Sequence, residues 1–177
     1  MKKAEKSIIT LFILSLAGWV NAQNDLAENL KDLKPFIGKT WKGEFKNSTK
    51  EKPVFDAARW ERALNGQAVR VLHSVNNGEY GGESIIVWEA KQKSLVFYYF
   101  TTAGFYTNGT IKFENGKFIS HEYVTGNQNG ITEVKGTYEI TMDGKMHGKS
   151  QYLQNGKWID GHEVIYVEDQ TAQVVFK

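Results

Sequence analysis

The chain has 177 residues, 22 of them basic and 20 acidic, with no cysteine and a formal net charge of +2. The lack of cysteine excludes disulfides, thiolate metal sites and a cysteine nucleophile. The nearly balanced charge gives no indication of a surface for nucleic acid or an anionic membrane, so we expect neither partner.

The N-terminal region has the pattern of a secretory signal peptide. Lys2, Lys3 and Lys6 precede an apolar run from Ile8 to Val20, and small residues end at Ala22. This run is short for a transmembrane helix, and no later segment approaches the roughly 20 apolar residues of a membrane span. We predict a signal peptide over residues 1–22, one domain over residues 23–177 without an integral membrane segment, and a periplasmic or secreted location.

The periodicity of the sequence changes from helical to alternating at about Gly38. Three leucines at helical spacing in Asp25–Lys34 predict a short helix that ends before Pro35. From Gly38 onward, short alternating runs are separated by Asn-Gly and Asp-Gly pairs, which tolerate the positive φ of tight hairpin turns. The pairs at 108–109 and 160–161 fit equally well within strands or bulges.

The alternating runs predict about ten strands in meander order. Such a sheet would leave long exposed edges unless it closed on itself. We therefore predict an all-β fold, a single closed up-and-down antiparallel barrel with a short N-terminal helix, with room inside for a small ligand. The expected strands span residues 41–45, 57–64, 68–75, 82–89, 95–101, 106–113, 118–125, 132–141, 147–153 and 158–167.

Four short segments carry a family resemblance. They are Leu33-Lys-Pro-Phe-Ile-Gly-Lys-Thr-Trp41, Trp60-Glu-Arg-Ala-Leu-Asn-Gly66, Val87-Trp88-Glu89 and Leu95-Val-Phe-Tyr98. Their order resembles the lipocalin-like, calycin-type barrels grouped as the DUF1579 family and, more distantly, the nitrobindin-like haem barrels. The resemblance implies that Trp41 packs at a closed end beneath the N-terminal helix. It also implies a haem-binding histidine late in the chain, in the region of His162.

The aromatic stretch Leu95–Thr107 is the most distinctive part of the sequence. It predicts either core packing or one wall of an apolar pocket, with tyrosine hydroxyls such as those of Tyr98 and Tyr123 inside it. Our leading interpretation is an exported binding barrel for a small apolar or amphipathic molecule. The ligand would be buried against Trp60, Trp88, Phe97, Tyr99, Phe105 and Tyr106, and oriented by Arg70 and His121.

Charged residues and histidines inside the expected strands are the other candidates. Most of them should face water, because alternation places charges on the outer face of a half-exposed sheet. They are Arg59, Glu61, Arg70, Glu83, His121, Glu122, His162 and Glu163.

Three alternatives to a binding barrel stay open. The first is an enzyme with general acid/base chemistry in the same pocket, for which Glu83, His121 and Glu163 are the nearest set, although no nucleophile or dinucleotide motif occurs. The second is a haem barrel with His162 or His121 as ligand; otherwise no cofactor is expected, and the four histidines lie on separate strands without metal-ligand spacing. The third is a structural protein whose interior is filled by side chains.

Overall fold

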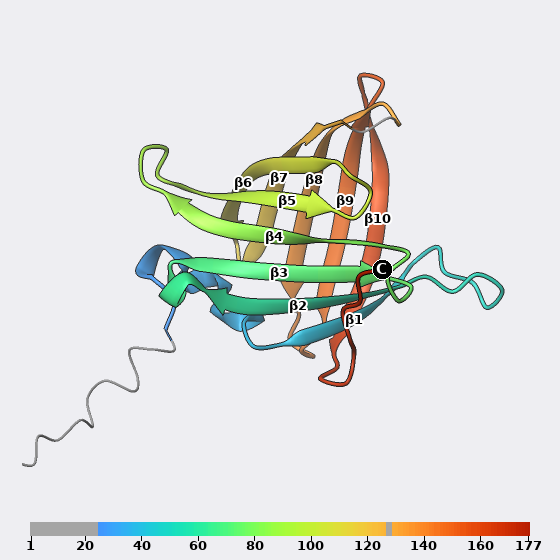
Figure 1. Ribbon diagram of the computed structural model, residues 1–177, viewed down its shortest axis with the longest axis horizontal. Helices are drawn as coiled ribbons and strands as arrows, with labels where there is room; N and C mark the ends of the chain where they lie inside the picture. Colours follow the sequence, from blue (N-terminus) through green and yellow to red (C-terminus); the bar gives the residue numbers. More distant parts are fainter. Residues whose placement is uncertain (1–24, 127–128) are drawn as a thin grey trace, which may run out of the picture.

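The protein is an antiparallel barrel of ten strands in the computed structural model, which describes residues 25–126 and 129–177 (Figure 1). The expected signal peptide lies outside the described residues. Each strand pairs with its neighbours in chain order, and β1 pairs with β10 to close the barrel, which confirms the predicted fold class. The strands are β1 (Thr40–Phe45), β2 (Phe55–Ala63), β3 (Ala68–Val75), β4 (Tyr80–Glu89), β5 (Ser94–Thr101), β6 (Tyr106–Glu114), β7 (Lys117–Thr125), β8 (Ile131–Ile140), β9 (Met146–Gln154) and β10 (Lys157–Glu168).

Asparagine and glycine form the tight turns between these strands. Asn77, Asn115 and Asn155 have φ values of 56°, 52° and 50°, and each is followed by a glycine that also has positive φ. This left-handed backbone is the conformation that short antiparallel hairpins require. The pairs at 108–109 and 160–161 lie within β6 and β10, and the register between β9 and β10 shifts at the second of them.

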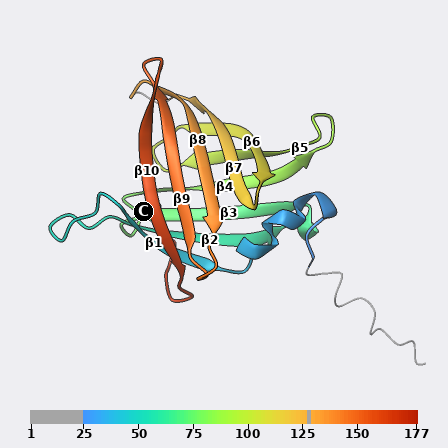
Figure 2. The same cartoon turned by 180° about the vertical axis from the view of Figure 1, so that it is seen from behind.

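A 3₁₀ helix, η1 (Glu28–Phe36), covers one end of the barrel (Figure 2). Its buried residues Leu30, Leu33 and Phe36 belong to the same core cluster as Trp41, which is fully buried as the resemblance implied. Pro35 lies inside the last turn and not beyond it, because the φ of proline suits a 3₁₀ turn. The helix ends at Ile37, whose backbone is extended. A second short turn, η2 (Leu64–Gly66), lies at the same end between β2 and β3.

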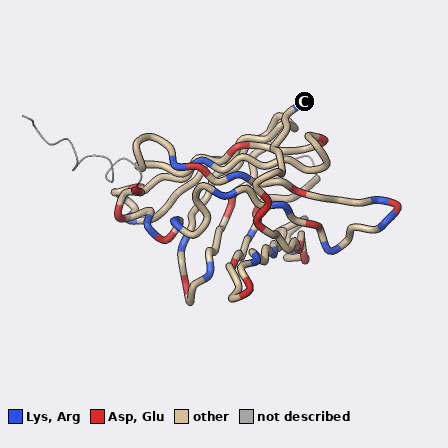
Figure 3. The backbone as a smooth tube through the Cα atoms, turned by 90° about the horizontal axis from the view of Figure 1, so that it is seen from below, with Lys and Arg blue, Asp and Glu red and all other residues tan. Residues whose placement is uncertain are grey.

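The outer wall carries paired charges and is partly covered by the last residues of the chain. Basic and acidic residues are interspersed along the backbone (Figure 3). The last residues cross the outer wall: the Asp169 N–H donates to the Thr40 carbonyl on β1 at 2.9 Å, and the Val175 N–H donates to Ser74 Oγ on β3 at 3.0 Å. The second contact covers Ser74, which is buried although it lies on the outer face. None of the described helices is long and apolar enough to span a membrane.

Candidate ligand-binding cavity

The interior of the barrel holds a cavity of about 720 Å³. Its lining includes Ala103, Phe105 and Asn129 from the loops opposite η1, so the cavity opens at that end and is closed at the other. Small-molecule sites in proteins commonly measure roughly 300 to 1,000 Å³. The volume therefore suits a small ligand and counts against an interior filled by side chains.

The deep part of the cavity is apolar. Trp60, Phe97, Ile111 and Phe118 form this floor together with neighbouring aliphatic side chains. The floor rests on η1, since the ring of Phe36 stacks on Trp60 with a centroid distance of 4.9 Å. Burial of an apolar ligand group here would remove its surface from water without leaving protein polar groups unpaired.

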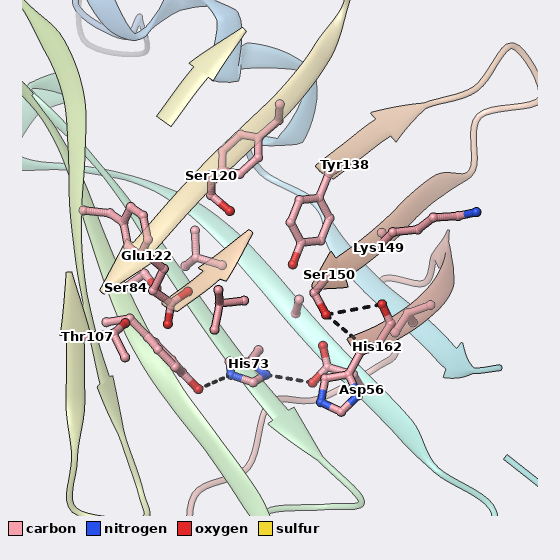
Figure 4. Close-up of a pocket in the computed structure, with 18 of the residues that line it drawn as sticks. Asp56, His73, Ser84, Thr107, Ser120, Glu122, Tyr138, Lys149, Ser150 and His162 are labelled. Carbon is pink, nitrogen blue, oxygen red and sulfur yellow. Dashed lines mark hydrogen bonds and ion pairs between the residues drawn. The ribbon is translucent and has the colours of Figure 1, made fainter. Parts of the chain in front are cut away.

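A chain of polar side chains crosses the wall nearer the opening. His73 Nδ1 lies 2.9 Å from Asp56 Oδ1, and His73 Nε2 lies 2.6 Å from the Tyr99 hydroxyl (Figure 4). Because a carboxylate only accepts, Nδ1 carries the proton in the first contact. The Tyr99 hydroxyl is also 3.1 Å from the Tyr80 hydroxyl. Four side chains from β2, β3, β5 and β4 thus form one hydrogen-bonded chain.

Gly82 leaves the space that this hydrogen-bonded chain of side chains requires. It lies on β4 between His73 on β3 and Thr101 on β5 in the strand register. A Cβ atom at Gly82 would stand 2.4 Å from the ring of Tyr99, closer than side-chain carbons approach. The missing side chain lets the Tyr99 ring lie across β4 and reach the histidine.

Asp56 is the buried residue at one end of this hydrogen-bonded chain. Only 3% of the residue is exposed, and its second carboxylate oxygen accepts a hydrogen bond of 2.9 Å from the Tyr166 hydroxyl. Burial, with the Asp56 charge as a further cause, raises the pKa of Tyr166 well above its usual value, so Tyr166 is a stable donor. Both carboxylate oxygens of Asp56 are therefore engaged by protein donors, as a buried charge requires.

Glu122 on β7 is a second cavity carboxylate, and it has a different environment. Burial raises its pKa, while the hydroxyl of Thr107 and the charge of His73 offset part of that rise. Figure 4 shows Thr107 beside it. Burial also raises the pKa of Tyr80, Tyr99 and Tyr152, and the negative charge of Glu122 contributes to each rise.

Two further titratable residues lie at the mouth. The ring of His162, which enters from β10 beside the irregular register, makes edge-to-face contacts with Phe45 and Tyr152. Partial burial lowers the pKa of this histidine, which favours the neutral imidazole. Lys149 also reaches the lining, but its ammonium points away and lies 3.4 Å from Glu163 on the outside (Figure 4).

The structure divides the eight ligand-binding residues expected from sequence into two equal groups. Trp60, Phe97, Tyr99 and Phe105 line the cavity. The other four lie outside the lining: Arg70, Trp88, Tyr106 and His121.

The structure corrects the position expected for this second group, whose members do not line the cavity. Arg70 lies on the outer wall and makes two hydrogen bonds of 2.8 Å to Glu83. His121 also faces outward, 2.6 Å from Glu133. Tyr106 is exposed on the outer face beside Phe100. Trp88 faces inward but packs against the core below the cavity floor.

The candidate acid/base set does not converge either. Glu83 pairs with Arg70, His121 with Glu133, and Glu163 with Lys46 at 2.7 Å, all outside the cavity lining. Tyr98 and Tyr123, considered for the aromatic wall, are likewise exposed on the outer face.

Sequence reasoning overlooked Asp56 and gave no particular role to His73. The available signal was period-two spacing: Asp56, Ala58 and Trp60 lie on one face of β2, so the orientation expected for Trp60 also places Asp56 inward. Among residues 25–126 and 129–177, no group of three or more metal-ligating side chains is arranged to hold a metal ion.

The fold and cavity define a closed antiparallel barrel with a ligand-sized interior. No family model matches the sequence, and no curated protein matches it. The DUF1579 and lipocalin resemblance therefore stays a prediction. Among solved structures, this chain is similar to the crystal structure of Rv2717c from M. tuberculosis, with a TM-score of 0.59 and 12% identity over 82% of this chain and 100% of that one. At this identity the likeness supports the barrel fold alone.

Proposed function

We propose that the protein binds a small amphipathic molecule inside the barrel. The observation that carries the proposal is the cavity of about 720 Å³, apolar at its floor and polar towards the end opposite η1. The apolar part of the ligand lies against Trp60, Phe97 and Phe118. Its polar group lies level with Glu122, where hydrogen-bonding groups of the ligand find partners.

A fluorescence binding assay tests this proposal directly. The uncharged fluorophore N-phenyl-1-naphthylamine becomes bright in apolar surroundings, and we expect it to bind with one site per chain. Ser84 lines the cavity from β4, so Ser84→Phe fills part of the interior. We expect this change to weaken binding about tenfold or more, since a bulky ring removes space that the ligand needs.

Ile85→Phe is the matched control. Ile85 is the next residue on the same strand and lies on the opposite face, outside the cavity lining. We expect its affinity for the fluorophore to match that of the unsubstituted protein. Equal affinities of the Ser84 and Ile85 variants would place the fluorophore elsewhere and contradict the proposal.

Haem is a second candidate ligand, favoured by the environment of His162. Both ring nitrogens of His73 are engaged by Asp56 and Tyr99, whereas the ring of His162 makes aromatic contacts at the cavity mouth. A neutral imidazole is the form that coordinates iron, and the lowered pKa of His162 favours it. Haem bound there would supply an iron centre for small gaseous ligands or electron transfer. A Soret band that His162→Ala abolishes would support this candidate, and a colourless protein after haem addition would contradict it.

We also propose a periplasmic or secreted location, on the basis of the signal-peptide pattern in residues 1–22. N-terminal sequencing of the protein from its host should find Gln23 first. An intact N-terminus in the cytoplasmic fraction would contradict this location.

A further inference from the structure

We propose that Glu122 and the tyrosines around it recognise a protonated primary or secondary amine on the bound ligand. This inference rests on the proposed binding function and names the chemical class of the ligand's polar group. It follows from the charge, the hydrogen bonding and the aromatic character of the upper cavity wall.

The cavity lining carries negative charge. Two carboxylates, Asp56 and Glu122, belong to the lining. In the described parts of the chain, Lys149 is the one lysine or arginine that reaches the lining, and its ammonium pairs with Glu163 on the outside. Apart from the two lining histidines, His73 and His162, the ionisable groups that face into the cavity as charges are therefore carboxylates, and a cationic ligand group complements them.

The two cavity carboxylates differ in their partners. Asp56 already accepts hydrogen bonds from His73 and Tyr166 on its two oxygens. Glu122 has no cationic side chain of the described residues as an ion-pair partner. A partly buried carboxylate without such a partner is costly, and a ligand ammonium would remove that cost. Glu122 is therefore the carboxylate available to a ligand.

The hydroxyl of Thr107 lies beside Glu122 and is open to a further hydrogen bond. This residue is only 1% exposed, and its Oγ1 atom is close enough to Glu122 to lower the pKa of that carboxyl, but it has no hydrogen-bond partner of good geometry among the described residues. It lies in the lining beside Glu122 (Figure 4). A hydroxyl and a carboxylate offer several acceptor positions, which suit an ammonium that carries two or three N–H donors. A quaternary ammonium could not use them.

Tyrosine rings surround Glu122 in the cavity wall. Tyr80, Tyr99, Tyr138 and Tyr152 line the cavity, and the Glu122 charge influences the pKa of all four. The faces of tyrosine rings attract cations. Rings close to a carboxylate form the kind of enclosure in which proteins bind organic ammonium groups.

The experiment compares three ligands of equal chain length: decylamine, 1-decanol and decanoate. Each displaces N-phenyl-1-naphthylamine from the full protein at pH 7.5, below the micelle-forming concentration. We expect decylamine to bind about tenfold more tightly than decanol, a difference of about 1.4 kcal/mol, and decanoate to bind most weakly. In Glu122→Gln, which keeps the size of the side chain, the preference for the amine over the alcohol should disappear while decanol affinity stays within about twofold.

Glu133→Gln is the matched control, because Glu133 lies on the outer wall beside His121. It removes the same charge from the protein and should keep the amine preference. The three wild-type affinities already test the inference if Glu122→Gln fails to fold. An amine that binds no better than decanol, or a preference that survives in a folded Glu122→Gln protein, would overturn the inference. Failure of decanol and the fluorophore to bind would instead refute the proposed binding function itself.

Discussion

The closed end and the open half of this barrel are stabilised in different ways. At the closed end, η1 and the cavity floor bring together apolar side chains whose contribution depends on volume and fit. In the open half, the inner wall holds Asp56, His73, Tyr99 and Glu122, whose contribution depends on individual polar atoms. The difference indicates that apolar burial at the closed end stabilises the fold. In the open half, polar groups that remain accessible to a ligand lower the stability.

The largest effect should come from the closed end. Leu33 is completely buried, and Leu33→Ala leaves a cavity between η1 and the barrel. We expect the free energy of unfolding in urea to fall by about 2 to 5 kcal/mol. Leu64, in η2 at the same end, is 70% exposed. Leu64→Ala should therefore change the free energy of unfolding by less than about 0.5 kcal/mol. Similar losses for both variants would contradict a closed end stabilised by burial.

A smaller effect should come from the hydrogen bond between Tyr166 and Asp56. Tyr166→Phe removes one donor from a buried carboxylate and leaves the ring in place. We expect a loss of about 1.5 to 3 kcal/mol in the free energy of unfolding. Tyr98→Phe, on the exposed outer face, should be nearly neutral, and an equally neutral Tyr166→Phe would show that Asp56 does not depend on this donor.

The smallest effect should come from Glu122 and should have the opposite sign. Burial raises the pKa of Glu122 in the folded state, so folded protein holds the proton to higher pH than unfolded protein does. The contribution of Glu122 to stability is therefore full below the unfolded pKa and is lost as pH rises through the folded pKa. Glu122→Gln should stabilise the ligand-free protein, and its advantage in urea unfolding should grow from pH 4.5 towards pH 8. A constant or shrinking advantage would indicate that Glu122 is not held in an environment that disfavours its charge.

The barrel itself was predictable from sequence because its turns are marked chemically. Asn-Gly or Asp-Gly pairs lie in six of the nine connections between strands, and each strand begins and ends within two residues of its expected position. Closure then follows from the cost of leaving long sheet edges unpaired.

The inward face of each strand was harder to predict, and the errors concern that choice. On β7, one face carries Phe118 and Glu122, and the other carries Ile119 and His121, so each face mixes polar and apolar character. On β3, the outer face that includes Arg70 also includes the buried Ser74, which the chain's last residues contact. The alternation of residues along a strand does not show which of two such faces points into the barrel, because contacts with distant segments decide the orientation.

The pairing of β1 with β10 has a consequence for how the chain is made. The first strand of the barrel finds one of its two neighbours only in Lys157–Glu168, more than a hundred residues later. During synthesis from the N-terminus, the free edge of β1 stays unpaired until nearly the whole chain has left the ribosome. The final step of folding joins the two most distant strands in sequence, and such non-local pairing is slow. A stalled or shortened chain that lacks β10 would expose two open edges where the complete barrel has none.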